Sequence, residues 1–513
     1  MPTRRTSALL SAAALAAALG LTGCAVAATT TQDGSTRTAS EIATPDDLTA
    51  EAILAANSDA TTVNDDEWDA STAVDLAVSA DTVTITEAGV YRLSGDYTGG
   101  VVVDAGDEAQ VVLILDGAEI SNADGPGIQV TSADDVGIFL EDGSTNTVSD
   151  AGTGYADDAD FHAAIASDAD LTISGTGALE VDAVDDGIST SDDLVILSGT
   201  IAVTAGDDGL RGHDALVVKD GALTVDAGGD ALTSDQDGDE TQGWIELAGG
   251  TLDLTAGDDG LDAQTDIVVT GGALTVDAAD DGLHSEVVLA IEGGEVTVAN
   301  ANEGIESFTI SIAGGTIDVT TSDDGLNASG GTSSGGGMGD GGQLLSLSGG
   351  TLTVNAQGDG LDSNGSIEMT GGDVVVQGPT ADDNGALDSN GSFTISGGTL
   401  VAIGSSGMAE TPDADSAQGF VSIGVTGSAG DVVEVTDADG TVIAEVTASK
   451  SFGNIVVSTA EVVDGQSYTA TVNGSSAGTG TAGEASSGFG GGGGMGGGGG
   501  GQRQGGGGSA PRG

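Results

Sequence analysis

The chain is poor in cysteine, in aromatic residues and in positive charge. It has 513 residues with a single cysteine, which excludes an intramolecular disulfide. Aromatic residues make up 3% of the chain, too few for the flat aromatic face that holds crystalline cellulose. Lys and Arg number 9 against 82 Asp and Glu, for a formal net charge of −73. Because Lys and Arg supply the charges that neutralise phosphates, this balance excludes nucleic acid as a direct partner.

The N-terminal segment has the order of a targeting signal. Arg4 and Arg5 precede an apolar stretch from Ala8 to Leu19, and Leu21-Thr22-Gly23-Cys24 follows. This order is typical of a secretory signal peptide that ends in a lipobox. We therefore expect removal of residues 1–23 and lipidation of Cys24, which would anchor the protein at the extracellular face of the cell membrane. No other segment is long and apolar enough to cross a bilayer.

The middle of the chain is an internal repeat. Each repeat has a glycine that opens a short β-rich run, and these glycines most often lie about 22 residues apart: Gly177, Gly199, Gly221, Gly250, Gly272, Gly294, Gly315, Gly350, Gly372 and Gly398. Weaker matches lie upstream at Gly95, Gly117 and Gly143. A fixed period of about 20–25 residues is typical of a solenoid. We expect these glycines at a corner where φ is positive or where backbones crowd together.

The runs within each repeat predict the fold. Ile267–Thr270 and Ala273–Asp277 alternate apolar and polar residues and are joined by turn residues, which predicts two short strands. Such strands must pair with the equivalent strands of neighbouring repeats. The predicted fold is all-β, a right-handed parallel β-helix with a small C-terminal β cap. Equivalent residues would stack in interior columns, one with Leu216, Ile267, Ile310 and Ile367, another with Leu223, Leu252, Leu274, Ile317 and Leu352.

Acidic residues form a second periodic pattern, in phase with the glycines. One or two acids precede a glycine and an aliphatic residue in most repeats. Carboxylates stacked about 4.8 Å apart repel one another by about 1 kcal/mol per pair even in water, so the column must bind cations or protons. Ca²⁺ takes about six to eight oxygen ligands from carboxylates and carbonyls. The predicted calcium ligands are Asp185, Asp186, Asp207, Asp208, Asp230, Asp258, Asp259, Asp280, Asp281, Glu303, Asp323, Asp324, Asp359 and Asp362.

A second candidate for a metal site lies in an insertion between two repeats. Its acids are Asp235, Asp237, Asp239 and, near the end of the loop, Glu246. The spacing resembles a calcium loop, but Gly238 and Glu240 stand where an oxygen ligand and a glycine would be expected. The sequence leaves open whether this is an ion site or a solvated acidic loop.

The segments outside the repeat have distinct compositions. Residues 24–72 are predicted to be a tether and N-terminal cap, with a short helix over 45–57 that starts at Thr44 and covers the open first strand of the coil. The coil is expected over 73–410, and a small β cap over 411–476 with a hairpin turn at Asp437–Gly440. Residues 477–513 are rich in glycine and are predicted to be disordered.

Several segments together resemble a known protein family. They are Val83–Gly95, Val112–Gly117, Gly358–Gly365 with its partial repeat Asn384–Gly391, and Gly404–Met408. Over about residues 73–475 the chain resembles a bacterial family of secreted carbohydrate-binding β-helix proteins. The resemblance implies an architecture similar to that of pectate lyases, bound calcium, and binding of cell-wall polysaccharides such as polygalacturonate and cellulose.

Three functions remain open from the sequence. The first is non-catalytic, calcium-dependent binding of an acidic polysaccharide by a surface-anchored protein. The second is a calcium-dependent, pectate-type polysaccharide lyase, in which Arg211 or Lys219 would be the catalytic base; the alternative for Arg211 is charge balance within the acidic column. The third is a structural stalk or adhesin. His162, His213 and His284 are expected at the surface near turns, and Trp244 in the core.

Overall fold

The protein is nearly all β. The computed structural model describes residues 47–150, 155, 161–330 and 340–484, all within the second of two compact units, Arg37–Gly513. Its main sheet has 37 strands with mostly parallel pairing, and a separate sheet has four strands. Helix in the described residues is limited to α1 (Ala50–Ala56) and the 3-10 turn η2 (Ala70–Thr72). None of the described helices has the length and apolar character that a membrane span requires.

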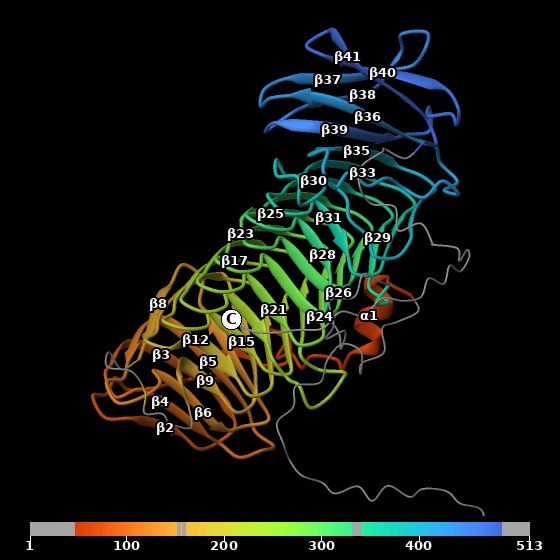
Figure 1. Ribbon diagram of the computed structural model, residues 1–513. Helices are drawn as coiled ribbons and strands as arrows, with labels where there is room; N and C mark the ends of the chain where they lie inside the picture. The colour runs from red at the N-terminus through yellow and green to blue at the C-terminus, as the bar shows by residue number, and fades with distance from the viewer. Residues whose placement is uncertain (1–46, 151–154, 156–160, 331–339, 485–513) are drawn as a thin grey trace, which may run out of the picture. The chain divides into compact units, whose positions relative to one another are not determined.

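Strands of the main sheet fall into three parallel stacks, which we number one to three (Figure 1). Stack one follows the repeat glycines: the end of β5 (Gln110–Ser121), then β8 (Thr145–Ser149), β11 (Ala178–Asp182), β14 (Thr200–Thr204), β17 (Ala222–Ala227), β20 (Thr251–Ala256), β23 (Ala273–Asp277), β25 (Glu295–Asn300), β27 (Thr316–Thr320), β30 (Thr351–Asn355), β33 (Asp373–Gln377) and β35 (Thr399–Gly404). Stack two follows the acidic turns: β2 (Val83–Ile85), β4 (Val101–Asp104), β6 (Ile128–Ser132), β9 (Ala163–Ser167), β12 (Asp186–Thr190), β15 (Leu210–Gly212), β18 (Leu232–Ser234), β21 (Leu261–Ala263), the starts of β24 (Leu283–Ile291) and β26 (Ile305–Ile312), β28 (Leu326–Ala328) and β31 (Leu361–Ser363).

Stack three completes each repeat. It contains β1 (Val74–Asp75), β3 (Gly89–Tyr97), the start of β5, β7 (Asp135–Leu140), β10 (Asp170–Gly175), β13 (Asp193–Ile196), β16 (Ala215–Val218), β19 (Trp244–Leu247), β22 (Asp266–Val269), the ends of β24 and β26, β29 (Leu344–Leu347), β32 (Ser366–Met369) and β34 (Phe393–Ile395). Upstream, the weaker glycine matches also coincide with strands: Gly95 lies in β3, Gly117 in β5, and Gly143 follows β7.

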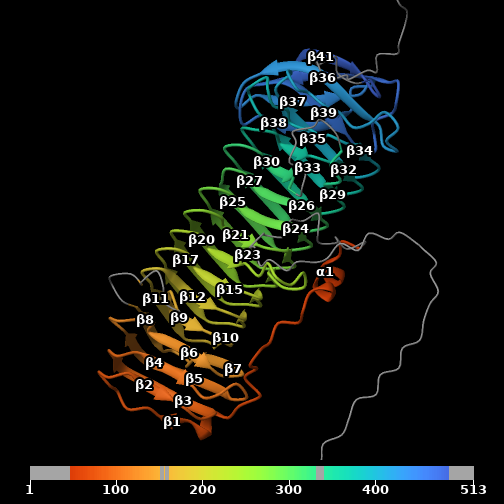
Figure 2. The same ribbon diagram turned by 60° about the horizontal axis from the view of Figure 1, so that its bottom comes forward.

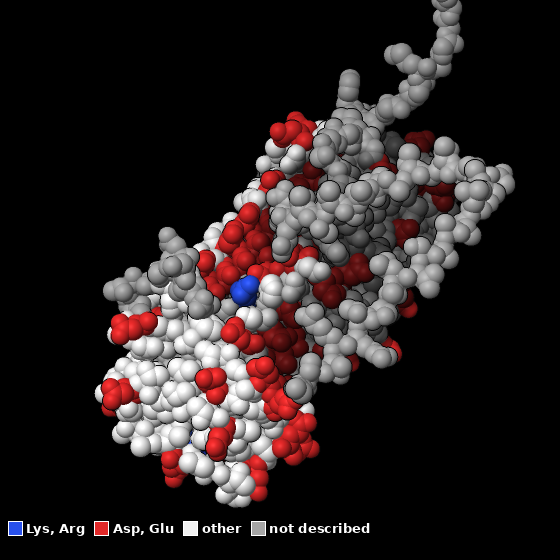
Figure 3. Space-filling model, turned by 90° about the horizontal axis from the view of Figure 1, so that it is seen from below, with Lys and Arg blue, Asp and Glu red and all other residues white. Residues whose placement is uncertain are grey.

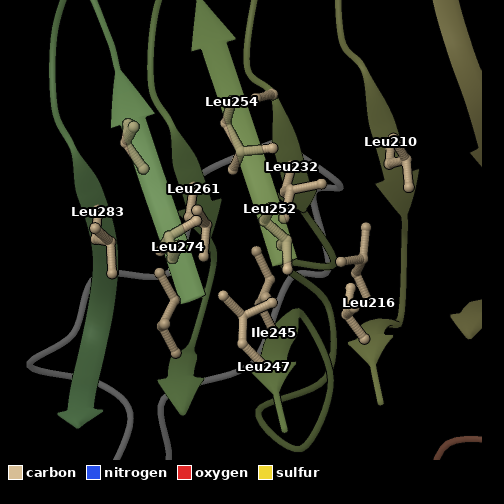
Figure 4. Packing of buried hydrophobic residues seen from close by; sticks show 14 of the residues in the cluster. Leu210, Leu216, Leu232, Ile245, Leu247, Leu252, Leu254, Leu261, Leu274 and Leu283 are labelled. Carbon is tan, nitrogen blue, oxygen red and sulfur yellow. The ribbon is translucent and has the colours of Figure 1, made fainter. Parts of the chain in front are cut away.

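Apolar side chains from the three stacks meet inside the coil. The register pairs Leu223 with Leu252 and Leu252 with Leu274, so the predicted column continues from strand to strand. The column with Leu216, Ile267, Ile310 and Ile367 is likewise continuous, through intermediate residues such as Ile245. A third column, Leu210, Leu232, Leu261 and Leu283, comes from stack two. All of these side chains are buried, and Figure 4 shows part of each column, with Leu252 and Leu274, Leu216 and Ile245, and Leu210 and Leu232 labelled.

The repeat glycines occupy the corner that their spacing predicts. Nine of the ten have positive φ, from 77° at Gly350 to 120° at Gly221. Gly177 differs, because the positive φ of that repeat is at Gly175. A Cβ added at Gly177 would lie 2.5 Å from the carbonyl oxygen of Glu141, so crowding accounts for this glycine.

The N-terminal segment lies along the side of the coil (Figure 2). Helix α1 begins after Thr49, whose hydroxyl accepts a hydrogen bond from the amide of Ala52; the predicted cap, Thr44, lies outside the described residues. Ile53 is fully buried against Val268 and Val288 of stack three. The prediction that this helix covers the first strand is therefore wrong: it covers apolar residues on the outer face of β22 and β24, which the repeat pattern assigns to neither interior column.

Further along, the same segment is held by carboxylates of the coil. The side-chain amide of Asn57 donates to Asp266 at 2.9 Å, and the backbone N–H of Thr61 donates to Asp193 at 2.8 Å.

Trp244 lies beneath Leu54 and Ala60 and is 5% exposed, which confirms it as a core residue.

The C-terminal part changes from parallel to antiparallel pairing. Strand β39 (Phe452–Ser458) pairs antiparallel with β35 and with β36 (Phe420–Gly427). The four-stranded sheet contains β37 (Val432–Thr436), β38 (Val442–Thr447), β40 (Ser467–Val472) and β41 (Ser475–Thr481). The hairpin turn at Asp437–Gly440 joins β37 and β38 as predicted. The predicted start of the disordered tail at 477 is wrong, because Gly478 and Gly480 lie within β41, close to the backbone of β36.

Candidate functional site

The last acid of each acidic turn stacks on its equivalent in the next repeat. We call this set the acid column: Asp186, Asp208, Asp230, Asp259, Asp281, Glu303, Asp324 and Asp359. The residue after each member donates its backbone N–H to the carbonyl oxygen of the next member, as Gly187 does to Asp208 at 2.8 Å and Gly260 to Asp281 at 2.9 Å. The column therefore runs along the edge where stack two begins. Figure 3 shows acidic side chains gathered in a band on one face of the molecule.

The carboxylates of the acid column are fixed by backbone hydrogen bonds between repeats. Asp208 Oδ1 accepts the N–H of Asp230 at 2.9 Å, and Asp230 Oδ1 accepts the N–H of Asp259 at 2.9 Å. Asp259 Oδ1 accepts the N–H of Asp281 at 2.7 Å. In these three carboxylates, Oδ1 is thus held by a backbone N–H of the next repeat, and Oδ2 does not take part in that bond. The sequence gives no sign of this arrangement, since it depends on side-chain rotamers at the corner.

A second column of polar side chains runs beside the acid column on stack two. The register places Asp262 opposite His284, His284 opposite Glu306, and Glu306 opposite Asn327. Asp362 follows Asn327 in the same column. His284, whose side chain is 27% exposed, has Nδ1 2.8 Å from Asp262 Oδ1 and 4.0 Å from Asp259 Oδ2.

Four groups of three residues along these columns have ligand atoms within 4.8 Å of one another: Asp185, Asp186 and Asp207; Asp258, Asp259 and Asp280; Asp259, Asp262 and His284; and Asp281, Glu303 and Glu306. Eight of the predicted ligands are thereby brought together. Asp208, Asp230, Asp323, Asp324, Asp359 and Asp362 belong to no such group in the described part of the chain. Glu306 was not predicted, although its position two residues after a turn glycine places it in register with Asp262 and Asp362.

Burial and neighbouring negative charges raise the pKa values of carboxyl groups in the acid column. Burial, together with repulsion from Asp208 and Asp185, raises the pKa of Asp186 to about 7. Burial with the charges of Asp262 and Asp208 raises the pKa of Asp230 to about 8. For His284, burial opposes the charged form, but the hydrogen bond to Asp262 and nearby carboxylates raise its pKa. A column that favours protons to this extent also favours cations that replace them.

One buried amide oxygen beside the group of Asp281, Glu303 and Glu306 lacks a hydrogen-bond partner. Asn327 is 8% exposed; its Nδ2 donates to Glu303 Oε2 at 2.7 Å, and its Oδ1 has no hydrogen-bond partner. Because a buried amide oxygen without a partner costs free energy, it is a natural ligand for a cation held by Asp281, Glu303 and Glu306. Carboxylates and an amide oxygen are ligands that a hard divalent cation such as Ca²⁺ accepts.

Two acids of the second predicted metal loop have other partners in the structure. Asp235 is bound by Arg211 at 2.8 Å and by His213 Nδ1 at 2.7 Å, while Glu246 lies in β19 and accepts from Lys219 Nζ at 2.6 Å. Asp237, Asp239 and these two acids belong to no metal-binding group among the described residues. The few cationic side chains of this region thus pair with the two ends of the loop, which favours the solvated-loop alternative. Cys24 lies outside the described residues.

A family model and a curated protein each match part of this chain. Residues 79–325 match the family model described as carbohydrate-binding domain-containing protein. A protein with that same description from Acetivibrio thermocellus is 39% identical over 138 residues, which are 26% of this chain and 48% of the relative. The chain thus spans about half the length of the curated relative that it matches.

A solved structure also matches part of the chain. It is that of a polysaccharide lyase-like protein from C. thermocellum, in a gadolinium derivative, with a TM-score of 0.41 and 32% sequence identity, over 43% of this chain and 95% of that one. The family match, at 79–325, contains all four groups of metal-binding residues along the two columns.

Proposed function

We propose that this protein is a right-handed parallel β-helix, with repeats of about 22 residues, that binds acidic polysaccharide through calcium ions without cleaving it. The observation that carries the proposal is the set of four ligand groups along one edge, all inside the segment that matches the carbohydrate-binding family model. Calcium would link the carboxylates of the protein to the carboxylates of uronate sugars. This link explains how a chain with a net charge of −73 can hold an acidic polymer.

Repetition supports a polymeric ligand. Equivalent residues in adjacent repeats are about 4.8 Å apart, so the groups present ligands at several positions along the direction of stacking. A polymer that engages several weak sites at once gains avidity without a strong contact at any one of them.

A pectate-type lyase is supported less well. Both candidate bases are engaged by carboxylates: Arg211 Nε and Nη2 donate to Asp235, and Lys219 Nζ donates to Glu246. A general base must be free to take the substrate proton. Their contacts favour charge balance over catalysis.

The binding proposal predicts calcium-dependent retention on polygalacturonate without turnover. The protein should be retained on the immobilised polymer in millimolar calcium and released by chelator. The absorbance of unsaturated uronide ends should stay flat with polygalacturonate and calcium across alkaline pH. A steady rise that disappears in Arg211→Ala would establish the lyase instead. No rise and no retention on any glycan would favour a stalk or adhesin.

We also propose that the protein is anchored outside the cell by lipid on Cys24, a proposal supported by the order of charged, apolar and lipobox residues in the sequence. The Cys24→Ala variant should lose its lipid and leave the membrane fraction, as measured by cell fractionation and mass spectrometry. Lipidated Cys24→Ala in the membrane fraction would contradict the proposal.

A further inference from the structure

A cavity opens at the edge of stack two, beside the first group of metal-binding residues. Its volume is about 240 Å³, and its wall includes Phe161, His162, Asp186, Ser189, Ser191 and Arg211. Pockets for drug-sized ligands hold roughly 300–1,000 Å³, so this cavity suits a single sugar unit rather than an oligosaccharide. Its wall offers an aromatic ring, hydroxyl groups, a carboxylate and a guanidinium, which are the groups that hold sugar rings, hydroxyls and acids.

Arg211 is the feature that distinguishes this cavity. Between Arg92 and Lys450 the sequence contains only Arg211 and Lys219 as basic residues. Arg211 is oriented by Asp235, which accepts from Nε at 3.0 Å and from Nη2 at 2.8 Å. Nη1 donates to Ser189 Oγ at 3.3 Å, and Ser189 is itself part of the cavity wall. A guanidinium has five N–H groups, so one on Nη1 is left for a ligand after these bonds and the contact of Nη2 with His213.

The aromatic side of the cavity is also fixed in place. The ring of His162 stacks on Tyr155 with centroids 5.3 Å apart, and His162 Nδ1 lies 2.9 Å from Asp185 Oδ2. Tyr155 in turn donates its hydroxyl to Asp150 at 2.8 Å. The wall therefore consists of residues that are already oriented by neighbours, which lowers the entropy cost of binding a ligand.

Charge selects the class of ligand. An anionic sugar is repelled by most of this surface and is attracted where a positive charge stands. Asp186 belongs both to the cavity wall and to the group formed with Asp185 and Asp207, so a cation held there would add a second positive charge next to Arg211. A neutral sugar gains nothing from this pairing, whereas a uronate carboxylate gains a charge-assisted hydrogen bond.

We infer that this cavity is a subsite for one hexuronate unit, with Arg211 binding its carboxylate and Asp186 and Ser189 its hydroxyls. The inference rests on the proposed function and adds to it the place where one sugar unit of the polymer binds. Arg211 is then a specificity residue rather than a base or a mere counter-charge.

The test is isothermal titration calorimetry at saturating calcium with trigalacturonate and with its methyl ester as the neutral probe. Wild-type protein should bind trigalacturonate at least tenfold more tightly than the ester, and Arg211→Gln should reduce that preference. A tenfold change corresponds to about 1.4 kcal/mol. Arg92→Gln is the matched control: Arg92 is 25% exposed against 26% for Arg211, and it too is paired with two groups, Asp116 and Glu141. It should bind as wild type.

A second variant tests the subsite independently, in case Arg211→Gln does not fold. Ser191 is an exposed residue of the cavity wall, so Ser191→Trp should obstruct the cavity, keep the coil folded and weaken binding of trigalacturonate at least tenfold. Unchanged binding in Ser191→Trp, or an unchanged preference in folded Arg211→Gln, would overturn the subsite. If the polymer is still retained by calcium in that case, the proposed function stands. If wild type binds neither trigalacturonate nor the polymer, both ideas fail together.

Discussion

In calcium-free buffer, the melting temperature of this protein should fall steeply as the pH rises from 5 to 8. Burial raises the pKa of Asp208, Asp259 and Asp324 to about 6, and that of Asp359 to about 7, each with help from neighbouring carboxylates. The unfolded chain holds these groups near 3.8. Above about pH 4 the folded state therefore binds more protons than the unfolded state. The stability that these bound protons contribute is fully present below about pH 4, and it is lost as the pH rises through the folded-state pKa values, at about 6 to 8.

The size of the effect follows from the number of groups. Each unit by which the pKa of a folded-state group exceeds the unfolded value corresponds to about 1.4 kcal/mol, and the shifts recur in every repeat from Asp186 to Asp362. Even after a large discount for solvent screening, we expect a drop of more than about 10 °C, measured by circular dichroism at constant ionic strength. Saturating calcium should flatten the curve, because bound cations replace the protons. A melting temperature that is constant or rises between pH 5 and 8 without calcium would show that folding does not raise the pKa values of these carboxyl groups.

The interior of the coil could be predicted from the sequence because the repeat converts spacing along the chain into stacking in space. Leu223, Leu252 and Leu274 follow the same position after a repeat glycine, and parallel pairing places them on one another. The corner was predictable for the same reason, since glycine at positive φ is required wherever the chain turns in that way.

The glycine after each acidic pair has a different cause, which only the packing reveals. The φ of Gly260 is not in the positive region, yet an added Cβ would lie 2.3 Å from Val276 Cγ1 and 2.4 Å from the carbonyl oxygen of Gly282. The sequence shows that a glycine recurs there. That it recurs for lack of space beside the next repeat could be found only from the structure.

Segments outside the repeat were poorly predicted because no period constrains them. The position of α1 depends on a match between Ile53 and the outward-facing Val268 and Val288, residues that lie far away in the sequence. The contacts of the acid column with its neighbouring side chains also join residues that are far apart in the sequence. His284 and Glu306 share the position of Asp262, two residues after a turn glycine, but their closeness to Asp259 and Asp281 is seen only in the structure.

Calcium should raise the melting temperature of the wild-type protein by more than about 10 °C at pH 7.5, and this response should depend on the acid column. Asp259 belongs to two ligand groups and Asp281 to a third. Asp259→Asn with Asp281→Asn removes two charges but keeps oxygens that can accept the N–H groups now bound, such as that of Asp281 at 2.7 Å. In calcium-free buffer the double variant should therefore be at least as stable as wild type, while its gain from calcium should fall by more than half.

Asp253→Asn with Asp318→Asn is the matched control, because both residues are exposed acids on stack one and neither belongs to a ligand group. It should respond to calcium as wild type does.

Whether the stacked carboxylates bind cations is measured most directly by a calcium titration of these three proteins, followed by melting temperature. We expect a saturable rise at calcium concentrations where magnesium has little effect, present in wild type and control and reduced in the column variant. An unchanged melting curve in excess calcium, or an equal rise in all three proteins with either ion, would contradict a cation site in the acid column.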